Sequence, residues 1–244
     1  YKMSVAVYIP VRLKSSRLPN KAILKIGNKT MVEHVFENTL KSKIIKHVFV
    51  ATCDPEIYNL MRERGANVIM TSRKHKRATD RVYEAYKKTD QKIKKKIKKI
   101  VMVQGDDPML TPKMIEAVVK SNNNHNQVTN ICNNIKLIDA KNPNRVKVVV
   151  NKKFEAVYFS REPIANSKKN KKKFFLKQGN IFCFSPKMLR KYCSLPQSKL
   201  EIVESVDMNR YLENDVRISM VLSKYDTVNV DTFNDLKKVR KLMK

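Results

Sequence analysis

Several features that would assign this chain of 244 residues to a specialised class are missing from its sequence. Its four cysteines are widely spaced and form no CxxC pair, which argues against a zinc site or a disulfide framework. No apolar run approaches the roughly 20 residues that a membrane-spanning helix needs. The N-terminus lacks the small-residue cleavage site of a signal peptide. We therefore expect a cytoplasmic protein with reduced thiols and no membrane partner.

Internal repeats and interdomain linkers are also absent. The chain is 42% hydrophobic, and a chain of this length buries roughly 70% of its unfolded surface. One apolar core can therefore stabilise the fold without a structural metal ion or a disulfide bond. The sequence predicts a single domain over residues 1–244.

Acidic residues are scarce relative to basic ones, and the formal net charge is +30. Such a charge can indicate a nucleic-acid-binding protein, because basic patches bind polyanions by releasing counterions. However, the lysines are spread along the chain, as a compositional bias produces. The densest runs, residues 92–99 and 168–173, contain no interleaved aromatic side chains of the kind that stack on single strands. We predict no nucleic-acid partner, and a nonenzymatic nucleic-acid-binding protein remains the alternative.

Short apolar runs alternate with amphipathic segments in the first half of the chain, which predicts βαβ units and a mainly parallel sheet flanked by helices. The predicted strands are residues 5–9, 46–51, 68–70 and 100–103, and the predicted helices are residues 31–40, 56–65, 79–87 and 111–119. The Asn-rich segment 121–134 fits a loop. The second half predicts a more antiparallel region, with strands at 146–151, 156–159, 181–184, 218–221 and 227–230 and helices at 201–212 and 231–243.

Ligands of parallel sheets bind beyond the carboxyl ends of the strands. In this chain the loops at those ends are residues 10–21, 53–54, 71–81 and 104–108. We expect the four loops to meet at one edge of the sheet and to form the site.

The first of these loops carries four cations, Arg12, Lys14, Arg17 and Lys21, directly after a strand. Arginine and lysine at a strand end suit a triphosphate, because charge-assisted bonds to phosphate are strong. A GxxxxGK[ST] loop is absent, so this is not a Walker-type site. Taken alone, the segment fits a solvated basic loop equally well.

Two aspartates are candidates for a Mg²⁺ site, since Mg²⁺ prefers one or two carboxylates together with substrate phosphates. Asp106 follows Gly105 at a predicted strand end, and Asp231 opens the last predicted helix. Each residue also has an ordinary structural explanation. Asp106 fits a turn, and Asp231 fits a helix N-cap.

Six segments, in order, resemble the sugar nucleotidyltransferases that make CMP-linked acid sugars, and above all the 3-deoxy-manno-octulosonate (Kdo) cytidylyltransferases. They are PVRLKSSRLPNK from Pro10, VATCD from Val50, MTSRKH with TDR from Met70, VQGDDP from Val103, NPNRVKVV with YFSR from Asn142, and VDTFNDL from Val230. Each motif is weak alone, but six in register along the whole chain are specific.

The resemblance implies a Rossmann-like nucleotidyltransferase fold of the glycosyltransferase-A type, with about residues 152–215 serving sugar binding and homodimerisation. It implies the reaction CTP + acid sugar → CMP-sugar + pyrophosphate, for lipopolysaccharide or surface polysaccharide synthesis. The nucleotide would be bound by Pro10, Arg12, Ser16, Arg17, Lys21, Ser72, Thr79, Arg81 and Gln104. The sugar would be bound by Gln104, Arg161, Gln178, Glu201 and Glu204, and Mg²⁺ by Asp106 and Asp231. The catalytic residues would be Arg12, Lys21, Asp106 and Asp231.

The chain departs from the family pattern in two places. Arg77-Ala78 stands where the family has a small residue and glycine, which makes the preference for cytosine less secure. Gln178 replaces a histidine, and Phe182 and Phe184 replace tyrosines, so fewer hydroxyl groups are available to a sugar. The acid sugar is therefore either Kdo or a modified form such as an 8-amino analogue. Another nonulosonate, or UTP with a sugar-1-phosphate, stays open as an alternative.

Overall fold

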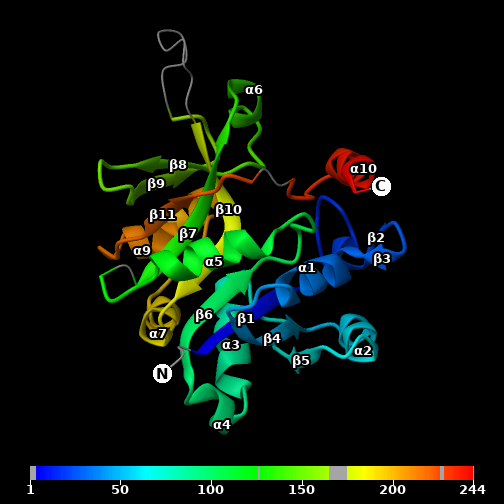
Figure 1. Ribbon diagram of the computed structural model, residues 1–244. Helices are drawn as coiled ribbons and strands as arrows, with labels where there is room; N and C mark the ends of the chain where they lie inside the picture. Colours follow the sequence, from blue (N-terminus) through cyan, green and yellow to red (C-terminus); the bar gives the residue numbers. More distant parts are fainter. Residues whose placement is uncertain (1–3, 126, 165–174, 226–227, 244) are drawn as a thin grey trace.

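A computed structural model of the chain describes residues 4–125, 127–164, 175–225 and 228–243. In this part of the chain a mixed sheet of nine strands runs through the molecule, with helices on both faces (Figure 1). The strand order is β11-β7-β10-β6-β1-β4-β5, and β8 and β9 form a hairpin that pairs with β10. The strands are β1 Ser4–Val11, β4 Ile45–Thr52, β5 Asn67–Met70, β6 Ile97–Val103, β7 Val128–Ile135, β8 Lys147–Val150, β9 Ala156–Ser160, β10 Phe175–Phe184 and β11 Ser219–Leu222.

The two halves of the sheet differ in strand direction, as the sequence predicts. β6, β1, β4 and β5 are parallel, so their carboxyl ends lie at one edge. β10 is antiparallel to both β6 and β7, and the β8–β9 hairpin is antiparallel as well. The prediction of a mainly parallel sheet with an antiparallel region is confirmed.

Strand β1 is buried along almost its whole length because helices cover both faces of the sheet. Val5, Val7 and Ile9 pack in one apolar cluster, while Ala6 and Tyr8 pack in another. The first cluster includes α1 Met31–Leu40, α2 Pro55–Glu63 and α5 Pro112–Ser121, and the second includes α3 Ala78–Lys88, α7 Pro186–Ser194 and α9 Asn209–Leu212. The alternation of side chains along a strand therefore builds a core on each side.

The C-terminal helix α10, Phe233–Leu242, lies at the carboxyl edge of the parallel strands (Figure 1). Its Leu236 and Val239 pack with Leu18 and with Ile26 of the β2–β3 ribbon, Lys25–Ile26 and Lys29–Thr30. This small apolar cluster holds the last segment of the chain against the first loop. The remaining elements are η1 Lys21–Ile23, α4 Gln91–Lys94, α6 Leu137–Ala140 and α8 Lys199–Glu204. None of the helices in the described ranges combines the length and apolar character needed to cross a lipid bilayer.

The predicted helix 201–212 is wrong in its continuity. The chain instead forms α8 and α9, separated at Ser205, whose φ of 52° is left-handed. A capping box between Ser198 and Glu201 starts α8 at Lys199, two residues earlier than predicted. The break at Ser205 turns the chain towards the sheet edge.

The loop predicted at residues 121–134 is also wrong, because most of its second half belongs to β7. Asn130 explains how an Asn-rich segment can form a central strand. Its side-chain amide donates to the carbonyl groups of Gly179 and Ile181 at 3.0 and 2.9 Å, where the register between β7 and β10 shifts. The polar side chain thus satisfies carbonyl groups that the strand pairing leaves free.

Two smaller predictions also differ. Residues 228–230 form no strand, and Thr227 lies outside the described residues, as does the lysine run 168–173. Lys99, at the end of the run 92–99, is not solvated. It is buried within β6, and its ammonium group donates to the carbonyl groups of Val119, in the last turn of α5, and of Asn122, the C-cap residue of that helix.

Candidate active site

The loop after β1 is anchored to the loop after β4. The backbone N–H of Leu13 donates to the carboxylate of Asp54 at 2.8 Å, and Asn20 N–H donates back to the Leu13 carbonyl at 3.1 Å. Asp54, singled out only by a sequence motif, therefore fixes the shape of the loop. This anchoring leaves the four cations of the loop at the carboxyl edge of the sheet.

Lys21 lies between the two aspartates that the sequence singled out. Its Nζ is 2.9 Å from Asp106 Oδ2 and 3.3 Å from Asp231 Oδ1. Arg17 Nη2 lies 2.7 Å from the same Asp231 oxygen. The side chains of Lys21, Asp106 and Asp231 are each about 15–20% exposed, so these charges are largely shielded from water. The structure thus brings together residues more than 200 positions apart.

The protonation of this cluster reflects its burial. Burial opposes the charge on Lys21, but the carboxylates of Asp106 and Asp231 outweigh it and raise the lysine pKa. Burial, together with repulsion from Asp106, raises the pKa of Asp231 above its ordinary value. The charges of Lys21 and Arg17 oppose this rise of the Asp231 pKa.

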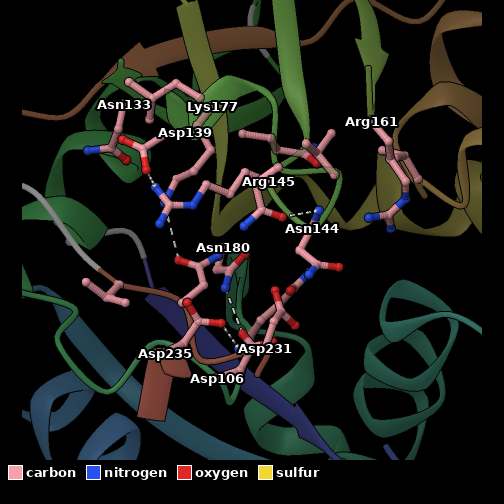
Figure 2. A pocket seen from close by; sticks show the side chains of 18 of the residues that line it. Asp106, Asn133, Asp139, Asn144, Arg145, Arg161, Lys177, Asn180, Asp231 and Asp235 are labelled. Atoms are coloured by element: carbon pink, nitrogen blue, oxygen red, sulfur yellow. Dashed lines mark hydrogen bonds and ion pairs between the residues drawn. The ribbon is translucent and has the colours of Figure 1, made fainter. Parts of the chain in front are cut away.

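Asp106 is held by two further contacts. Asn180 on β10 donates its side-chain amide to Asp106 Oδ1 at 2.7 Å, and the Val230 N–H donates to the Asp106 carbonyl at 2.9 Å. Figure 2 shows Asp106, Asp231 and Asn180 close together at one end of a pocket. The geometry fixes both carboxylates before any ligand binds.

A cavity of about 290 Å³ opens between the first loop and this cluster. Its lining includes the predicted nucleotide residues Pro10, Arg12, Ser16, Arg17, Lys21 and Gln104, together with Asp106 and Asp231. Cations of the loop and hydroxyl groups of its serines face one space, which suits a polyphosphate. We call this space the phosphate cavity.

The other predicted nucleotide residues, Ser72, Thr79 and Arg81, are not among its lining residues. Thr79 is fully buried, and its hydroxyl donates to Asp207 Oδ2 at 2.9 Å. Arg81 is also buried and donates to the Thr71 hydroxyl, while Ser72 N–H donates to Glu84 at 3.0 Å. Here these three residues hold the loop after β5, and their contact with a nucleotide stays a prediction.

A larger cavity of about 870 Å³ lies on the other side of the two aspartates. Arg17, Gln104, Asp106, Asp207 and Asp231 line both cavities. The rest of its lining includes Gln178 together with residues that Figure 2 labels, which are Asn133, Asp139, Asn144, Arg145, Arg161 and Lys177. This polar wall suits a ligand rich in hydroxyl and carboxylate groups, and we call the space the sugar cavity.

Arg161 is fixed in the wall of the sugar cavity by backbone acceptors. It donates from Nε to the Glu204 carbonyl at 2.7 Å, from Nη1 to the Pro143 carbonyl at 2.9 Å and from Nη2 to the Ser205 carbonyl at 3.2 Å. Gln178 Nε2 is buried and has no hydrogen-bond partner among the described residues. Both residues line the sugar cavity, and their contact with a sugar stays a prediction.

The two glutamates predicted to bind the sugar are placed differently. Glu201 is fully buried and makes a bidentate ion pair with Arg210, with both N···O distances 2.7 Å. Glu204 accepts hydrogen bonds from the Tyr158 hydroxyl and the Arg161 N–H, each at 2.7 Å. Neither residue is among those lining the sugar cavity. They support the wall, and direct contact with a sugar stays a prediction.

The donor set of Asp106 and Asp231 fits a divalent cation. Their oxygens already converge on one cationic atom, Lys21 Nζ, and both residues line the phosphate and sugar cavities. In the described part of the chain no three side chains of histidine, cysteine, aspartate or glutamate form a metal-binding cluster. Two carboxylates completed by substrate phosphates is the arrangement that Mg²⁺ commonly uses.

Sequence reasoning missed two residues of this site. Asn180 carries the amide that orients Asp106, and Asp207 lines both cavities. Asn180 lies between Gln178 and Phe182 on β10, so a polar side chain in a segment that resembles the family was the available signal. Asp207 was hidden by the prediction of one continuous helix.

Comparison with known proteins gives consistent matches. The family model described as "Cytidylyltransferase" matches residues 6–218. The chain is 36% identical to a 3-deoxy-manno-octulosonate cytidylyltransferase of Thermodesulfovibrio yellowstonii, over 96% of each chain. It is 35% identical to that of Escherichia coli, over 99% of this chain and 97% of the relative.

Solved structures agree with the sequence matches. The structure of CMP:2-keto-3-deoxy-manno-octonic acid synthetase complexed with CTP has a TM-score of 0.89 and 34% identity, and the match covers 98% of both chains. A 4-diphosphocytidyl-2C-methyl-D-erythritol synthase from Anaerococcus prevotii has a TM-score of 0.66 at 13% identity, covering 100% of this chain and 99% of the other. The second likeness is one of fold alone.

Proposed function

Because this chain belongs to the cytidylyltransferase family, we propose that it transfers a cytidylyl group from CTP to 3-deoxy-manno-octulosonate (Kdo) and releases pyrophosphate. The observation that carries the proposal is the position of the Asp106–Lys21–Asp231 cluster. It lies where the phosphate cavity meets the sugar cavity. A reaction between a triphosphate and an acid sugar needs both reactants to meet at one charged point.

In this reaction the anomeric hydroxyl oxygen of the sugar forms a bond to the α-phosphorus and loses its proton to water, and the bond from that phosphorus to the pyrophosphate oxygen breaks. Arg12, Arg17 and Lys21 neutralise the triphosphate and stabilise the charge that builds up on the leaving pyrophosphate. Arg17 and Lys21 bind Asp231 in the free protein. They would exchange these contacts for oxygens of the triphosphate. Placing the two reactants on either side of one cluster supplies proximity and orientation.

Asp106 and Asp231 would hold Mg²⁺, and Asn180 would keep Asp106 in position for it. The bound cation would polarise the α-phosphate and lower the pKa of the attacking hydroxyl. Lys21 balances the two carboxylates when no cation is bound.

The sugar would lie against Arg161, Gln178 and Gln104. The guanidinium group of Arg161 supplies the positive charge for the sugar carboxylate. The side-chain amide of Gln178 would pair with a sugar oxygen, since its Nε2 is buried without a partner among the described residues. This wall accommodates Kdo or an analogue with an amino group in place of one hydroxyl, such as the 8-amino analogue.

We further propose that the protein works in the cytoplasm as a homodimer and supplies CMP-Kdo for lipopolysaccharide or surface polysaccharide synthesis. Val157, Ile202 and Val203 are 56%, 58% and 79% exposed on β9 and α8. Exposed apolar side chains gathered on neighbouring elements are typical of an interface. These elements lie within residues 152–215, where the family resemblance places dimerisation.

The test is pyrophosphate release from CTP, Kdo and Mg²⁺ with three isosteric variants. Asp106→Asn and Asp231→Asn should each lower kcat by about 100-fold or more, because each removes a carboxylate charge that would hold the Mg²⁺ stabilising the transition state. Asp215→Asn is the matched control. Asp215 is exposed and left-handed at a φ of 55°, a conformation that asparagine tolerates. Full activity of both Asp106→Asn and Asp231→Asn would refute the metal assignment.

A further inference from the structure

Arg77 is the last residue of the loop after β5. All three nitrogens of its guanidinium group bind the turn 201–205 at the end of α8. Nε lies 3.0 Å from Glu201 Oε1, Nη2 donates to the Glu201 carbonyl at 3.0 Å, and Nη1 donates to the Ser205 hydroxyl at 2.8 Å. The Arg77 side chain is only 15% exposed. An arginine with a partner for each nitrogen in a shielded position moves together with the segment that it binds.

Arg161, which lines the sugar cavity, binds the same turn. Its guanidinium group donates to the carbonyl groups of Glu204 and Ser205. The last carbonyl groups of a helix have no partner within the helix, and Arg161 satisfies those of Glu204 and Ser205 here. Arg77 adds a bond to the Glu201 carbonyl, which also accepts the N–H groups of Ser205 and Val206. Any displacement of the turn 201–205 therefore moves the contacts of Arg77 and Arg161 together.

The two arginines belong to opposite sides of the site. Ala78, next to Arg77, lines the phosphate cavity, whereas Arg161 and Ser205 line the sugar cavity. Arg77 is not among the lining residues of either. Asp207, which lines both, accepts hydrogen bonds from Thr79 and lies 3.7 Å from Arg77 Nε. The turn after α8 is thus connected by short contacts to both cavities.

We propose that Arg77 is a positioning residue that couples occupancy of the phosphate cavity to the placement of Arg161 in the sugar cavity. A nucleotide that orders the loop carrying Ala78 and Thr79 fixes Arg77, and through it the α8 turn from which Arg161 is held. Binding at one cavity then favours binding at the other, because the cost of ordering the shared turn is met only once. This inference rests on the proposed function only in assigning the nucleotide and the acid sugar to these cavities.

The first experiment measures the KM for Kdo at low and at saturating CTP in the wild type, Arg77→Ala, Arg77→Lys and Ser205→Ala. In the wild type, saturating CTP should lower the KM for Kdo by about tenfold, within the usual range of coupling between sites. Arg77→Ala should abolish this dependence while kcat at saturation of both substrates changes by less than about threefold. Arg77→Lys should not restore it, since one ammonium group cannot reach three acceptors. Ser205→Ala removes one contact and should weaken the dependence by an intermediate amount.

The second experiment needs no turnover, so it separates failure of this inference from failure of the proposed function. Hydrogen exchange of the amides in residues 199–208 is followed with and without CTP in the wild type, Arg77→Ala, Ser205→Ala and the control Arg62→Ala, which alters an exposed arginine of α2. CTP should slow exchange in the wild type and the control, but not in Arg77→Ala. Equal slowing in Arg77→Ala, or none in a wild type to which CTP is shown to bind by calorimetry, would overturn the proposal, whereas absence of CTP binding would count against the proposed function. If Arg77→Ala fails to fold, the same comparison with Ser205→Ala decides it, and equal slowing there would overturn it.

Discussion

Lys21 is the residue on which the charge balance of the site depends. It stands between two carboxylates at distances of 2.9 and 3.3 Å, where we propose that a metal cation binds. Without it, Asp106 and Asp231 would face each other with only Arg17 to offset their charge. The same ammonium group is available to a triphosphate once a cation takes over the carboxylates.

Replacing Lys21 should therefore separate these two roles. Lys21→Met should lower kcat by about 100-fold, because one transition-state donor is lost. It should also make the Tm more sensitive to Mg²⁺ than in the wild type, because the cation then relieves an unbalanced pair of carboxylates. Thermal unfolding with and without Mg²⁺ measures this effect, and Lys29→Met, in an exposed ion pair with Glu37, is the control. If the Tm of Lys21→Met does not respond to Mg²⁺, the proposal that Asp106 and Asp231 bind the cation is contradicted.

Lys147 is a second buried cation, and its effect should depend on pH. Burial lowers its pKa to about 8, although its ammonium group donates to the carbonyl groups of Asn142 and Arg161. Between pH 8 and about 10.5 the unfolded state holds more protons on this residue than the folded state does. The free energy of unfolding should therefore rise with pH in this window, by up to roughly 3 kcal/mol.

The comparison variant is Lys147→Met, which lacks the titrating group. Denaturant unfolding at pH 7 and pH 9.5 should show the wild type gaining stability relative to Lys147→Met as the pH rises. A constant difference between the two proteins, or one that shifts in favour of the variant, would show that Lys147 titrates normally.

Single residues also show how far the sequence predicts the site. Lys21, Asp106 and Asp231 were predicted to form one site because the family resemblance places each in a motif at a strand or helix end. Local patterns alone left a solvated loop, a turn and a helix N-cap open. The burial of Glu201 could not, because its partners Arg210 and Arg77 come from two other segments. An ion pair between distant segments leaves no mark in the local pattern of either.

At the scale of elements, the close approach of the loop after β6 to the end of β1 shapes the phosphate cavity. A Cβ atom on Gly105 would lie 2.1 Å from Val11 Cγ1, well inside contact distance. Only a glycine lets the segment that carries Asp106 lie against β1.

Gly105→Ala should accordingly destabilise the fold by about 1–3 kcal/mol through overpacking and lower kcat by moving Asp106. Since the clash is with one methyl group of Val11, the double variant Gly105→Ala with Val11→Ala should recover part of both losses. Tm and pyrophosphate release measure the two effects. If the second substitution adds its own loss without any recovery, the close approach is not the cause.

Elements with a clear period were predictable, and those stabilised by side-chain bonds were not. The helices at residues 31–40 and 111–119 show apolar faces in the sequence and form as predicted. β7 was missed because Asn130 contributes to it through hydrogen bonds to β10 rather than through apolar packing. The break at Ser205 was missed because the arginines that satisfy the end of α8 come from elsewhere.

At the scale of the whole molecule, the apolar surface on β9 and α8 predicts self-association. Val203→Asp should convert a dimer into a monomer, because it places a charge in an apolar interface. Light scattering coupled to size-exclusion chromatography measures the mass. Leu40→Asp changes a side chain that is 54% exposed on α1, and it should leave the mass unchanged. A wild-type protein that is monomeric at micromolar concentration would contradict the proposed interface.

The mixed sheet sets the arrangement of the site. Its four parallel strands bring the loop after β1 and Asp106 to one edge, and Asp231, just before α10, lies at the same edge. The sequence predicts that these strands are parallel, but it does not predict the size of the sugar cavity. That cavity depends on β7, β10 and the turn after α8, where the predictions of strand and helix were least complete. The identity of the sugar is therefore the part of the account that an experiment tests best.

The most direct test is a matrix of nucleotides against sugars, scored by pyrophosphate release with Mg²⁺. The nucleotides are CTP, UTP, ATP and GTP, and the sugars are Kdo, its 8-amino analogue and a neutral sugar-1-phosphate. The account predicts release with CTP together with Kdo or its 8-amino analogue, and little with the other pairs. Release from UTP with the sugar-1-phosphate, and none from CTP with either acid sugar, would contradict it.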